Sequence, residues 1–413
     1  MRLFPATADA NAKRLIYARA LRAVADGYVS ILLPAYLLAL GFDAFEVGVL
    51  TAATLLGSAS LTLFAGLITA RFGHRRPLLA AAGLMVATGL GFAGLQAFWP
   101  LLLIAFVGTI NPSTGDVSVF LPLEQSLLAQ SVSDKDRTGL FVRYSLAGSL
   151  LGAAGTLLAA LPDIVGGWSG ATPLQIMQGM FLLYAVIGLA SAMIYRRVEE
   201  PLPVPGDARS EPLGPSRKIV YRLAALFSID AFAGGLIVQS MLALWLFQVF
   251  GMSLTAAATL FFWSNLLSAA SYLAAVPIAN RIGLIRTMVF THLPSSLCLV
   301  AIPFVSSLPV VIGLLLLRSL LSQMDVPTRN SYVMAVVTPG ERPAAASLTS
   351  VPRSLASGIG PVISGYLIML SGFGWLLLIG GVLKIGYDLA LLAMFSHVRP
   401  PEEREPMPAE RRA

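Results

Sequence analysis

The feature that most constrains this chain is a nearly unbroken succession of long apolar segments, separated by short turns that contain glycine, proline or charge. Charged residues make up 12% of the 413 residues, about half the share that a soluble domain carries. A helix crosses the hydrocarbon core of a bilayer with about 20 apolar residues, so this length holds about twelve spans. We therefore predict an all-α polytopic membrane protein.

The apolar segments divide into two groups of six. The longest polar interval between them, residues 196–218, is rich in proline, glycine and charge, which is typical of a linker. The predicted spans are 17–40, 45–69, 77–97, 99–131, 138–161, 174–195, 220–249, 252–279, 284–305, 308–337, 343–370 and 373–396. We expect an N-terminal six-helix bundle over 1–195, the linker over 196–218, a C-terminal six-helix bundle over 219–398 and a tail over 399–413.

Lysine and arginine occur in every second predicted loop. The outer loops, near residues 41–45, 97–99, 162–173, 250–252, 305–308 and 370–373, contain neither residue. The positive-inside rule then places both termini in the cytoplasm, and we expect a multi-pass protein of the bacterial inner membrane. The inner loops contain Arg71, Arg75, Arg76, Lys135, Arg137, Arg196, Arg197, Arg209, Arg217, Lys218, Arg281, Arg286 and Arg342.

The two halves of the chain resemble each other at nearly one offset, which indicates a duplicated six-helix unit. Asp26 in the first span corresponds to Asp230 in the seventh. The other ordered matches join Arg71-Phe72-Gly73 to Arg281-Ile282-Gly283, Pro122-Leu123-Glu124-Gln125 to Pro327-Thr328-Arg329-Asn330, Asp136-Arg137 to Glu341-Arg342, and Gly155 to Gly360.

The loop after the second span reads Gly-Leu-Ile-Thr-Ala-Arg-Phe-Gly-His-Arg-Arg, from Gly66 to Arg76. It resembles the signature loop Gly-x-x-x-Asp-Arg-x-Gly-Arg-Arg of the major facilitator superfamily, and residues 275–286 resemble a weaker second copy. The resemblance implies a secondary transporter of two six-helix bundles. Ala70 and Asn280 stand where the family places the aspartate that helps to latch the outward-open state, so the resemblance does not carry this latch over to the chain. The matching positions are Gly66, Arg71, Gly73, Arg75 and Arg76, with Arg281 and Gly283 in the second copy.

A glycine-rich stretch, Gly358 to Gly365, is similar to the Gly-Pro motif of drug–proton antiporters. That motif belongs to span five in the family, whereas here it lies in span eleven, so its function is not carried over. Small residues allow helices to approach closely, and we predict this role for Gly360 and for Gly148 and Gly152 in span five.

Ionisable side chains at membrane depth are costly and therefore mark candidate positions on a substrate or proton pathway. Arg318, Ser322, Asp325 and Arg329 have the spacing of one helix face. In span four, Pro112 and Gly115 predict a kink. The candidates for the pathway are Asp26, Asp116, Glu124, Asp230, Arg318, Asp325 and Arg329.

The positions of these groups predict how several of them are paired. Glu124 and Arg329 occupy equivalent depths in opposite halves, which favours an ion pair across the central cavity, either with each other or through a substrate; the alternative is a static salt bridge at the helix ends. Asp26 and Asp230 could carry protons, or could be neutralised by Arg19, Arg22 or Arg222. Lys384 and Asp388, four residues apart, are expected to pair with each other.

No motif predicts an enzyme, a cofactor or a metal site. There is no Walker A loop, and the three histidines lack metal-ligand spacing. The basic residues form short clusters rather than one patch, which argues against a nucleic-acid partner. We expect a monomer in the lipid bilayer.

The residues favour a secondary transporter that moves a small solute by alternating access, with that solute and protons as its expected partners, and with efflux slightly favoured over uptake. The alternative is a membrane receptor or lipid-handling protein that keeps the transporter fold without coupled transport. The absent aspartate at position 70 is the feature that supports the alternative.

The topology can be tested with cysteines at two positions, Gly167→Cys and Gly206→Cys, each in a Cys298→Ser background. An impermeant thiol reagent added to intact cells should label position 167 and spare position 206. Labelling of position 206 from outside would contradict the twelve-span arrangement with both ends inside.

Overall fold

The computed structural model describes residues 9–113, 118–131, 134–200 and 213–396. This part of the chain is almost entirely helical, and eleven of its helical segments are long and apolar enough to cross a membrane. The remaining span consists of two shorter helices, α4 and α5. The prediction of about twelve spans in two bundles is therefore confirmed.

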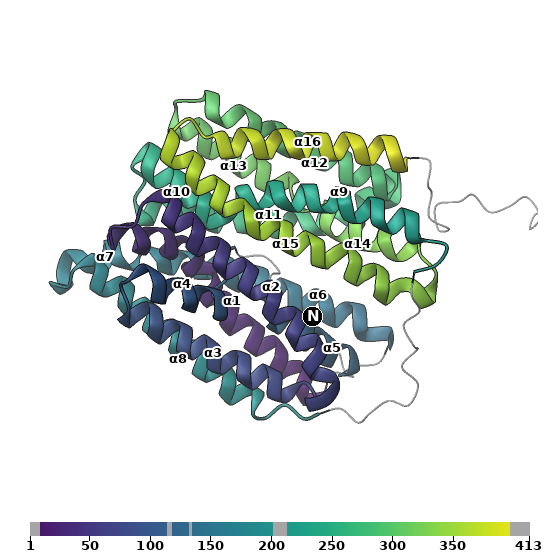
Figure 1. Ribbon diagram of the computed structural model, residues 1–413, viewed down its shortest axis with the longest axis horizontal. Helices are drawn as coiled ribbons and strands as arrows, with labels where there is room; N and C mark the ends of the chain where they lie inside the picture. The colour runs from purple at the N-terminus through teal and green to yellow at the C-terminus, as the bar shows by residue number, and fades with distance from the viewer. Residues whose placement is uncertain (1–8, 114–117, 132–133, 201–212, 397–413) are drawn as a thin grey trace, which may run out of the picture.

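The N-terminal half runs from α1 to α8 and the C-terminal half from α9 to α16 (Figure 1). The first half contains α1 (Ala10–Ala39), α2 (Ala44–Phe72), α3 (Arg75–Gly94), α4 (Phe98–Val107), α5 (Phe120–Gln130), α6 (Asp134–Thr156), η1 (Leu157–Ala160), α7 (Leu161–Ser169) and α8 (Pro173–Tyr195). The second contains α9 (Arg217–Leu236), α10 (Gln239–Phe250), α11 (Leu254–Ile282), α12 (Leu284–Ala301), η2 (Ile302–Phe304), α13 (Leu308–Leu321), α14 (Asp325–Ala335), η3 (Pro339–Glu341), α15 (Arg342–Leu370) and α16 (Trp375–Phe395).

Spans four and ten are each broken into two helices. Pro122 and Pro327 are the third residues of α5 and α14. A proline ring clashes with the carbonyl four residues earlier, but proline is tolerated in a first turn, where its missing N–H is not needed. The repeated proline therefore favours a helix start at α5 and at α14.

These breaks refine two predictions and correct one. The predicted kink near Pro112 is a break in the helix, because α4 ends at Val107, the described residues 108–113 and 118–119 are not helical, and α5 begins at Phe120. The predicted single helix face from Arg318 to Arg329 is wrong, because α13 ends at Leu321 and α14 begins at Asp325. The predicted outer loop 162–173 is also largely helical, since α7 covers its first part.

The two halves contact each other through α2 with α15 and α6 with α11. The two ends of the molecule are named as follows. The 'linker end' is the end at which α1 and α9 begin, and the 'far end' is the opposite end, which contains α7 and α10 (Figure 1). Inside each half, equivalent pairs of helices pack together, α1 with α6 and α9 with α15.

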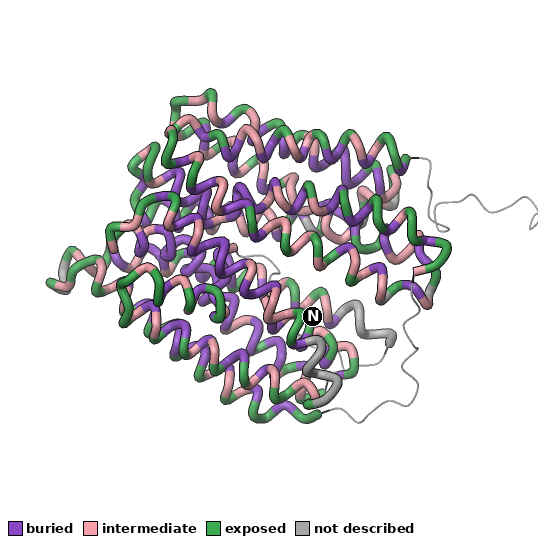
Figure 2. The backbone as a smooth tube through the Cα atoms, viewed as in Figure 1, coloured by how far each residue is buried: buried purple, intermediate pink, exposed green. Residues whose placement is uncertain are grey.

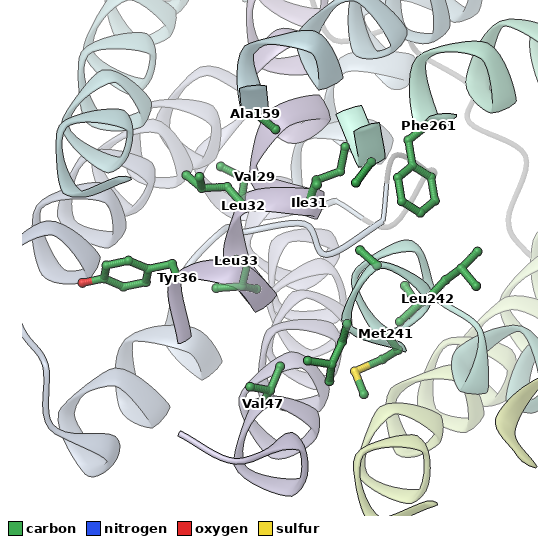
Figure 3. Close-up of a cluster of buried hydrophobic side chains, with 14 of the residues drawn as sticks. Val29, Ile31, Leu32, Leu33, Tyr36, Val47, Ala159, Met241, Leu242 and Phe261 are labelled. Atoms are coloured by element: carbon green, nitrogen blue, oxygen red, sulfur yellow. The ribbon is translucent and has the colours of Figure 1, made fainter. Parts of the chain in front are cut away.

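Among the described residues, the apolar core is continuous across the two halves only toward the far end. There, one cluster joins Val29 and Leu33 of α1 to Met241 and Leu242 of α10 and Phe261 of α11 (Figure 3). Toward the linker end, the buried apolar residues form two further clusters, one confined to each half. Figure 2 shows the buried stretches of both halves adjoining near α1 and α10.

Hydrogen bonds between the halves also lie toward the far end. The Gln239 amide donates to the Ser30 hydroxyl at 2.9 Å. The Asp163 carboxylate in α7 accepts from the backbone N–H of Thr255 at 2.8 Å and from its hydroxyl at 2.9 Å. Together with the continuous apolar cluster, these bonds hold the halves together at this end.

Glycine permits close helix contacts at the predicted positions, with one adjustment. A Cβ on Gly360 would lie 2.5 Å from the backbone nitrogen of Leu236 and 2.7 Å from the Cα of Gly235 in α9. A Cβ on Gly152 would meet its nearest neighbour at 3.6 Å, an ordinary contact. In span five a Cβ on Gly148 would lie 2.5 Å from the Arg19 side chain, and the tight contact with backbone is at Gly155, where a Cβ would lie 2.7 Å from the Cα of Val24.

We predict that Gly360→Ala destabilises the protein, whereas Gly386→Ala does not. A methyl group at position 360 meets α9 backbone, and such overpacking costs about 1–3 kcal/mol. A methyl group at position 386 meets no atom within 4 Å, so it should show only the better helix propensity of alanine. Thermal melting of the purified variants measures the difference, and equal melting temperatures would refute the close approach.

Candidate transport site

Glu124 in α5 is the centre of a buried cluster in the N-terminal half. Its side chain is fully buried and forms an ion pair with Arg22 of α1. The hydroxyls of Tyr144 in α6 and Tyr195 in α8 donate to its two carboxylate oxygens at 2.5 and 2.6 Å. Four helices thus converge on one carboxylate, and its charge is compensated inside its own half.

Aromatic rings surround the arginines of the same cluster. The Arg22 guanidinium lies 3.9 Å from the centre of the Phe120 ring, and that of Arg19 lies 5.7 Å from the centre of the Tyr144 ring. Such contacts are stronger in desolvated sites than at a surface. Asp26, one turn after Arg22, makes no hydrogen bond or ion pair within the described residues, but its charge interacts with Arg19 and Arg22. The arrangement matches the alternative in which nearby arginines neutralise Asp26.

The C-terminal half contains a larger network around Asp230 of α9. One carboxylate oxygen of Asp230 accepts from the Lys384 ammonium of α16 at 2.6 Å, and the other from the Arg329 guanidinium of α14 at 3.4 Å. Arg329 also pairs with Asp325 one turn earlier at 3.0 Å. The predicted proximity of Asp325 and Arg329 is therefore confirmed.

The network extends to His292 of α12, which pairs with Asp388 of α16. The His292 Nδ1 lies 2.9 and 3.1 Å from the two Asp388 oxygens, and its Nε2 lies 3.5 Å from the Lys384 ammonium. His292 was not among the predicted site residues, because the histidines were considered only as metal ligands. Its position in the middle of an apolar segment could have identified it as a buried titratable group.

Two predicted pairings are wrong. Glu124 and Arg329 each have partners in their own half, so they do not pair across the cavity. Lys384 and Asp388 also have other partners, Asp230 and His292. In both cases, the actual partner lies on a neighbouring helix of the same half and is not the residue inferred from sequence spacing.

The two halves use the same helix pairing with opposite charges. Arg22 of the first span pairs with Glu124 of the fourth, and Asp230 of the seventh pairs with Arg329 of the tenth. Because positions 124 and 329 match in the internal repeat, the base and the acid have exchanged places. Both pairs tie the linker-end part of a broken span to the first span of its half.

Arg318 of α13 stands apart from these clusters. Its Nε is buried without a hydrogen-bond partner among the described residues, and its backbone carbonyl accepts from Ser295 at 3.3 Å. The remaining candidate, Asp116, lies outside the described residues.

A family profile described as the Major Facilitator Superfamily matches residues 15–248 and 223–412. The chain belongs to this superfamily. A protein of Saccharomyces cerevisiae described as an uncharacterized membrane protein is 24% identical over 411 residues, which cover 91% of this chain and 92% of the yeast protein. Membership and the multi-pass helical fold support a membrane transporter.

Solved structures share the fold at low sequence identity. A mutant form of the nucleoside transporter NupG has a TM-score of 0.75 and 13% identity, with coverage of 93% of this chain and 100% of that chain. An auto-inhibited peptide transporter of the POT family has a TM-score of 0.72 and 12% identity, covering 96% and 99%. The human organic anion transporter MFSD10 has a TM-score of 0.62 and 19% identity, covering 92% and 99%.

The superfamily's signature loop joins α2 to α3 through Gly73, whose φ of +73° favours glycine. The Glu200 carboxylate, at the start of the linker, accepts from the backbone N–H groups of His74 at 3.1 Å and Arg75 at 2.6 Å. A negative charge is therefore present at the first turn of α3, where the helix dipole favours it.

The other predicted positions of the signature loop and of its second copy, where the structure describes them, are exposed or lie between two helices. In the second copy, Gly283 has a φ of +88° between α11 and α12, and Arg281 is exposed. Arg76 is exposed as well. The side chains of Gly66 and Arg71 lie outside the described residues.

The other end of the linker is held by Glu341 of η3. Its carboxylate accepts from the backbone N–H of Gly214 at 2.5 Å. Hydrogen bonds from Ser216 and then Gly214 lower the pKa of Glu341 to about 2. Since this pKa is depressed, the carboxylate stays charged at neutral pH, and the contact weakens only as the pH falls toward about 2.

We predict that the Arg22–Glu124 pair is energetically coupled and that Glu124 and Arg329 are not. Arg22→Met or Glu124→Gln alone leaves a buried group without its partner, which typically costs about 3–5 kcal/mol. The double variant should lose less than the sum of the two single losses, whereas Glu124→Gln with Arg329→Met should be additive.

Denaturation of the purified variants measures these energies. Glu199→Gln is the matched control, because the Arg14–Glu199 pair at 3.4 Å is exposed and should contribute only about 0–1 kcal/mol. A coupling energy between Glu124 and Arg329, and none between Arg22 and Glu124, would instead show that Glu124 and Arg329 pair across the cavity.

Proposed function

We propose that this chain is a proton-coupled secondary transporter that moves a small solute by alternating access. The observation that carries the proposal is the network of Asp230, Asp325, Arg329 and Lys384, which is buried within membrane spans of one half. Ionisable groups at this depth are costly and usually serve substrate or ion movement. Glu124 and Arg22 form the smaller counterpart in the other half.

The contacts between the halves support alternating access. They comprise apolar packing, glycine contacts and a few hydrogen bonds, and no ion pair among those of the described residues joins α1–α8 to α9–α16. With the predicted orientation, the far end faces outward, so the halves are joined at the outside. Efflux, slightly favoured from the sequence, stays a prediction.

The composition of the networks narrows the solute class. Acidic and basic groups alternate along the chain of contacts from Asp325 through Arg329 and Asp230 to Lys384. A zwitterion or an organic anion carried with a proton can exchange ion pairs with such a network without leaving a charge unpaired. Similar folds are described as transporters of nucleosides, peptides and organic anions.

A receptor or lipid-handling protein remains the second candidate function, because Ala70 stands in place of the superfamily's aspartate. A flux assay in proteoliposomes distinguishes a transporter from a receptor or lipid-handling protein. A panel of labelled nucleosides, dipeptides and organic anions is offered under an imposed pH gradient, with Asp325→Asn as the comparison. A transporter should accumulate a compound only with the gradient, and Asp325→Asn should abolish the accumulation. Saturable binding without flux would favour the receptor.

A cross-link at the far end should stop transport. Asp163→Cys with Thr255→Cys, in a Cys298→Ser background, places two thiols where a carboxylate now contacts Thr255. Oxidation should abolish flux of the panel compound, and a reductant should restore it, because the halves must separate here to open the other side. Each single cysteine variant should be insensitive to oxidation. Undiminished flux in the cross-linked protein would contradict alternating access.

A further inference from the structure

His292 occupies a position where one ring nitrogen contacts an acid and the other faces a base. The Nδ1 contacts Asp388 at 2.9 Å, and the Nε2 lies 3.5 Å from the Lys384 ammonium and 3.9 Å from one oxygen of Asp230. Lys384 contacts that same oxygen of Asp230 at 2.6 Å. Lys384 and the His292 Nε2 therefore compete for one carboxylate oxygen.

The hydrogen-bonding partners of His292 determine which ring nitrogen carries the proton. Asp388 as a carboxylate can only accept, so Nδ1 carries the proton that the two groups share. The ammonium of Lys384 can only donate, so Nε2 has its lone pair directed toward Lys384. In this arrangement, His292 is neutral and Nε2 is the one ring atom that can take another proton.

The ion pairs of the network join three carboxylates, Asp230, Asp325 and Asp388, to two permanent cations, Arg329 and Lys384. A neutral His292 therefore leaves one negative charge in the network, which a second proton on the ring would balance. The titratable groups that face His292 or belong to its network are Asp388, Lys384 and Tyr387 of α16, Asp230 of α9, Asp325 and Arg329 of α14, and Arg353 of α15, with Cys298 on the same helix and Arg318 on α13 nearby.

We propose that His292 is a proton-binding residue, and that a proton on Nε2 transfers the shared oxygen of Asp230 from Lys384 to His292. The inference rests on the proposed proton coupling and names the group that carries the proton. The bond lost is Lys384 Nζ–H to Asp230, and the bond gained is His292 Nε2–H to the same oxygen. No other group changes its protonation state.

This exchange connects proton binding to the helices of the half. Before it, Asp230 ties α9 to α16 through Lys384 and to α14 through Arg329. Afterwards, Asp230 ties α9 to α12, and Lys384 is left with an unpaired positive charge. The freed ammonium, with the buried Nε of Arg353 that lacks a hydrogen-bond partner among the described residues, makes the site attractive to an anionic group of a solute.

Histidine NMR of the whole protein in lipid nanodiscs tests the proposal directly, because the chain has three histidines. His292→Gln and His74→Gln assign the signals. The His292 signal should show the Nδ1–H tautomer at high pH and gain a second proton on Nε2 as the pH is lowered. A signal that keeps one protonation state at every pH at which the protein stays folded would overturn the proposal.

Lys384→Met tests the competition and keeps the histidine in place. Removing the neighbouring cation should allow His292 to take its proton at a higher pH, whereas His74→Gln should not alter the His292 titration. Unchanged titration in Lys384→Met would show that the two groups do not compete and would overturn the exchange. Melting curves of both variants confirm that they are folded.

The proteoliposome assay distinguishes this inference from the proposed function. If wild-type protein shows gradient-driven flux but His292 does not titrate, the inference is wrong and the transporter remains. If His292 titrates in a Lys384-dependent way and no gradient-driven flux is found, the proton-binding residue stands and coupled transport is wrong. His292→Gln should lose gradient-driven accumulation of the panel compound.

Discussion

The compensation of buried charge within each half is the interaction on which the rest of the structure depends. A bilayer provides no water to stabilise an isolated carboxylate or guanidinium, so such a group needs a partner in the protein. Arg22 and Glu124 satisfy each other in the first half, and Asp230, Arg329 and Lys384 do so in the second. Because neither half borrows a charge from the other among the described residues, the halves can part without exposing an unpaired ion. Their contacts at the far end are apolar packing, close glycine approaches and hydrogen bonds, all of which can be broken at modest cost.

The broken spans supply the geometry that the charge pairs need. A proline lies in the first turn of α5 and of α14, where it is tolerated, and Glu124 and Arg329, each two residues later, pair with the first helix of their half. Asp325 occupies the first turn of α14, where the helix dipole favours a negative charge, and Arg329 follows one turn later. The same device therefore appears twice, with the acid and the base exchanged, and the C-terminal copy has acquired the additional partners Lys384, His292 and Asp388. That added set makes the second half the more suitable one for binding a proton.

Much of the architecture follows from local properties of the chain. The apolar segment lengths, the placement of basic residues and the repeat of Pro122 at Pro327 are visible without any structure, and they predict the spans, the duplication and the superfamily resemblance. The contact of Asp325 with Arg329 was predictable for the same reason, since residues four apart on a helix lie on one face. The close approach at Gly360 was predictable from a cluster of small residues, although the corresponding tight contact in span five proved to be at Gly155.

The partners of the buried charges were decided by the tertiary structure alone. Glu124 meets Arg22 across 102 positions of sequence, Lys384 meets Asp230 across 154, and His292 meets Asp388 across 96. Hydropathy and spacing report how each residue lies relative to its own helix, but not the rotation of that helix against its neighbours, which packing of all side chains determines. For this reason, the pairings of Glu124 with Arg329 and of Lys384 with Asp388 were wrong even though every residue in them was correctly recognised as a buried charge. The sequence determined which groups must be compensated inside the membrane, and only the packing of the helices decided which group compensates which.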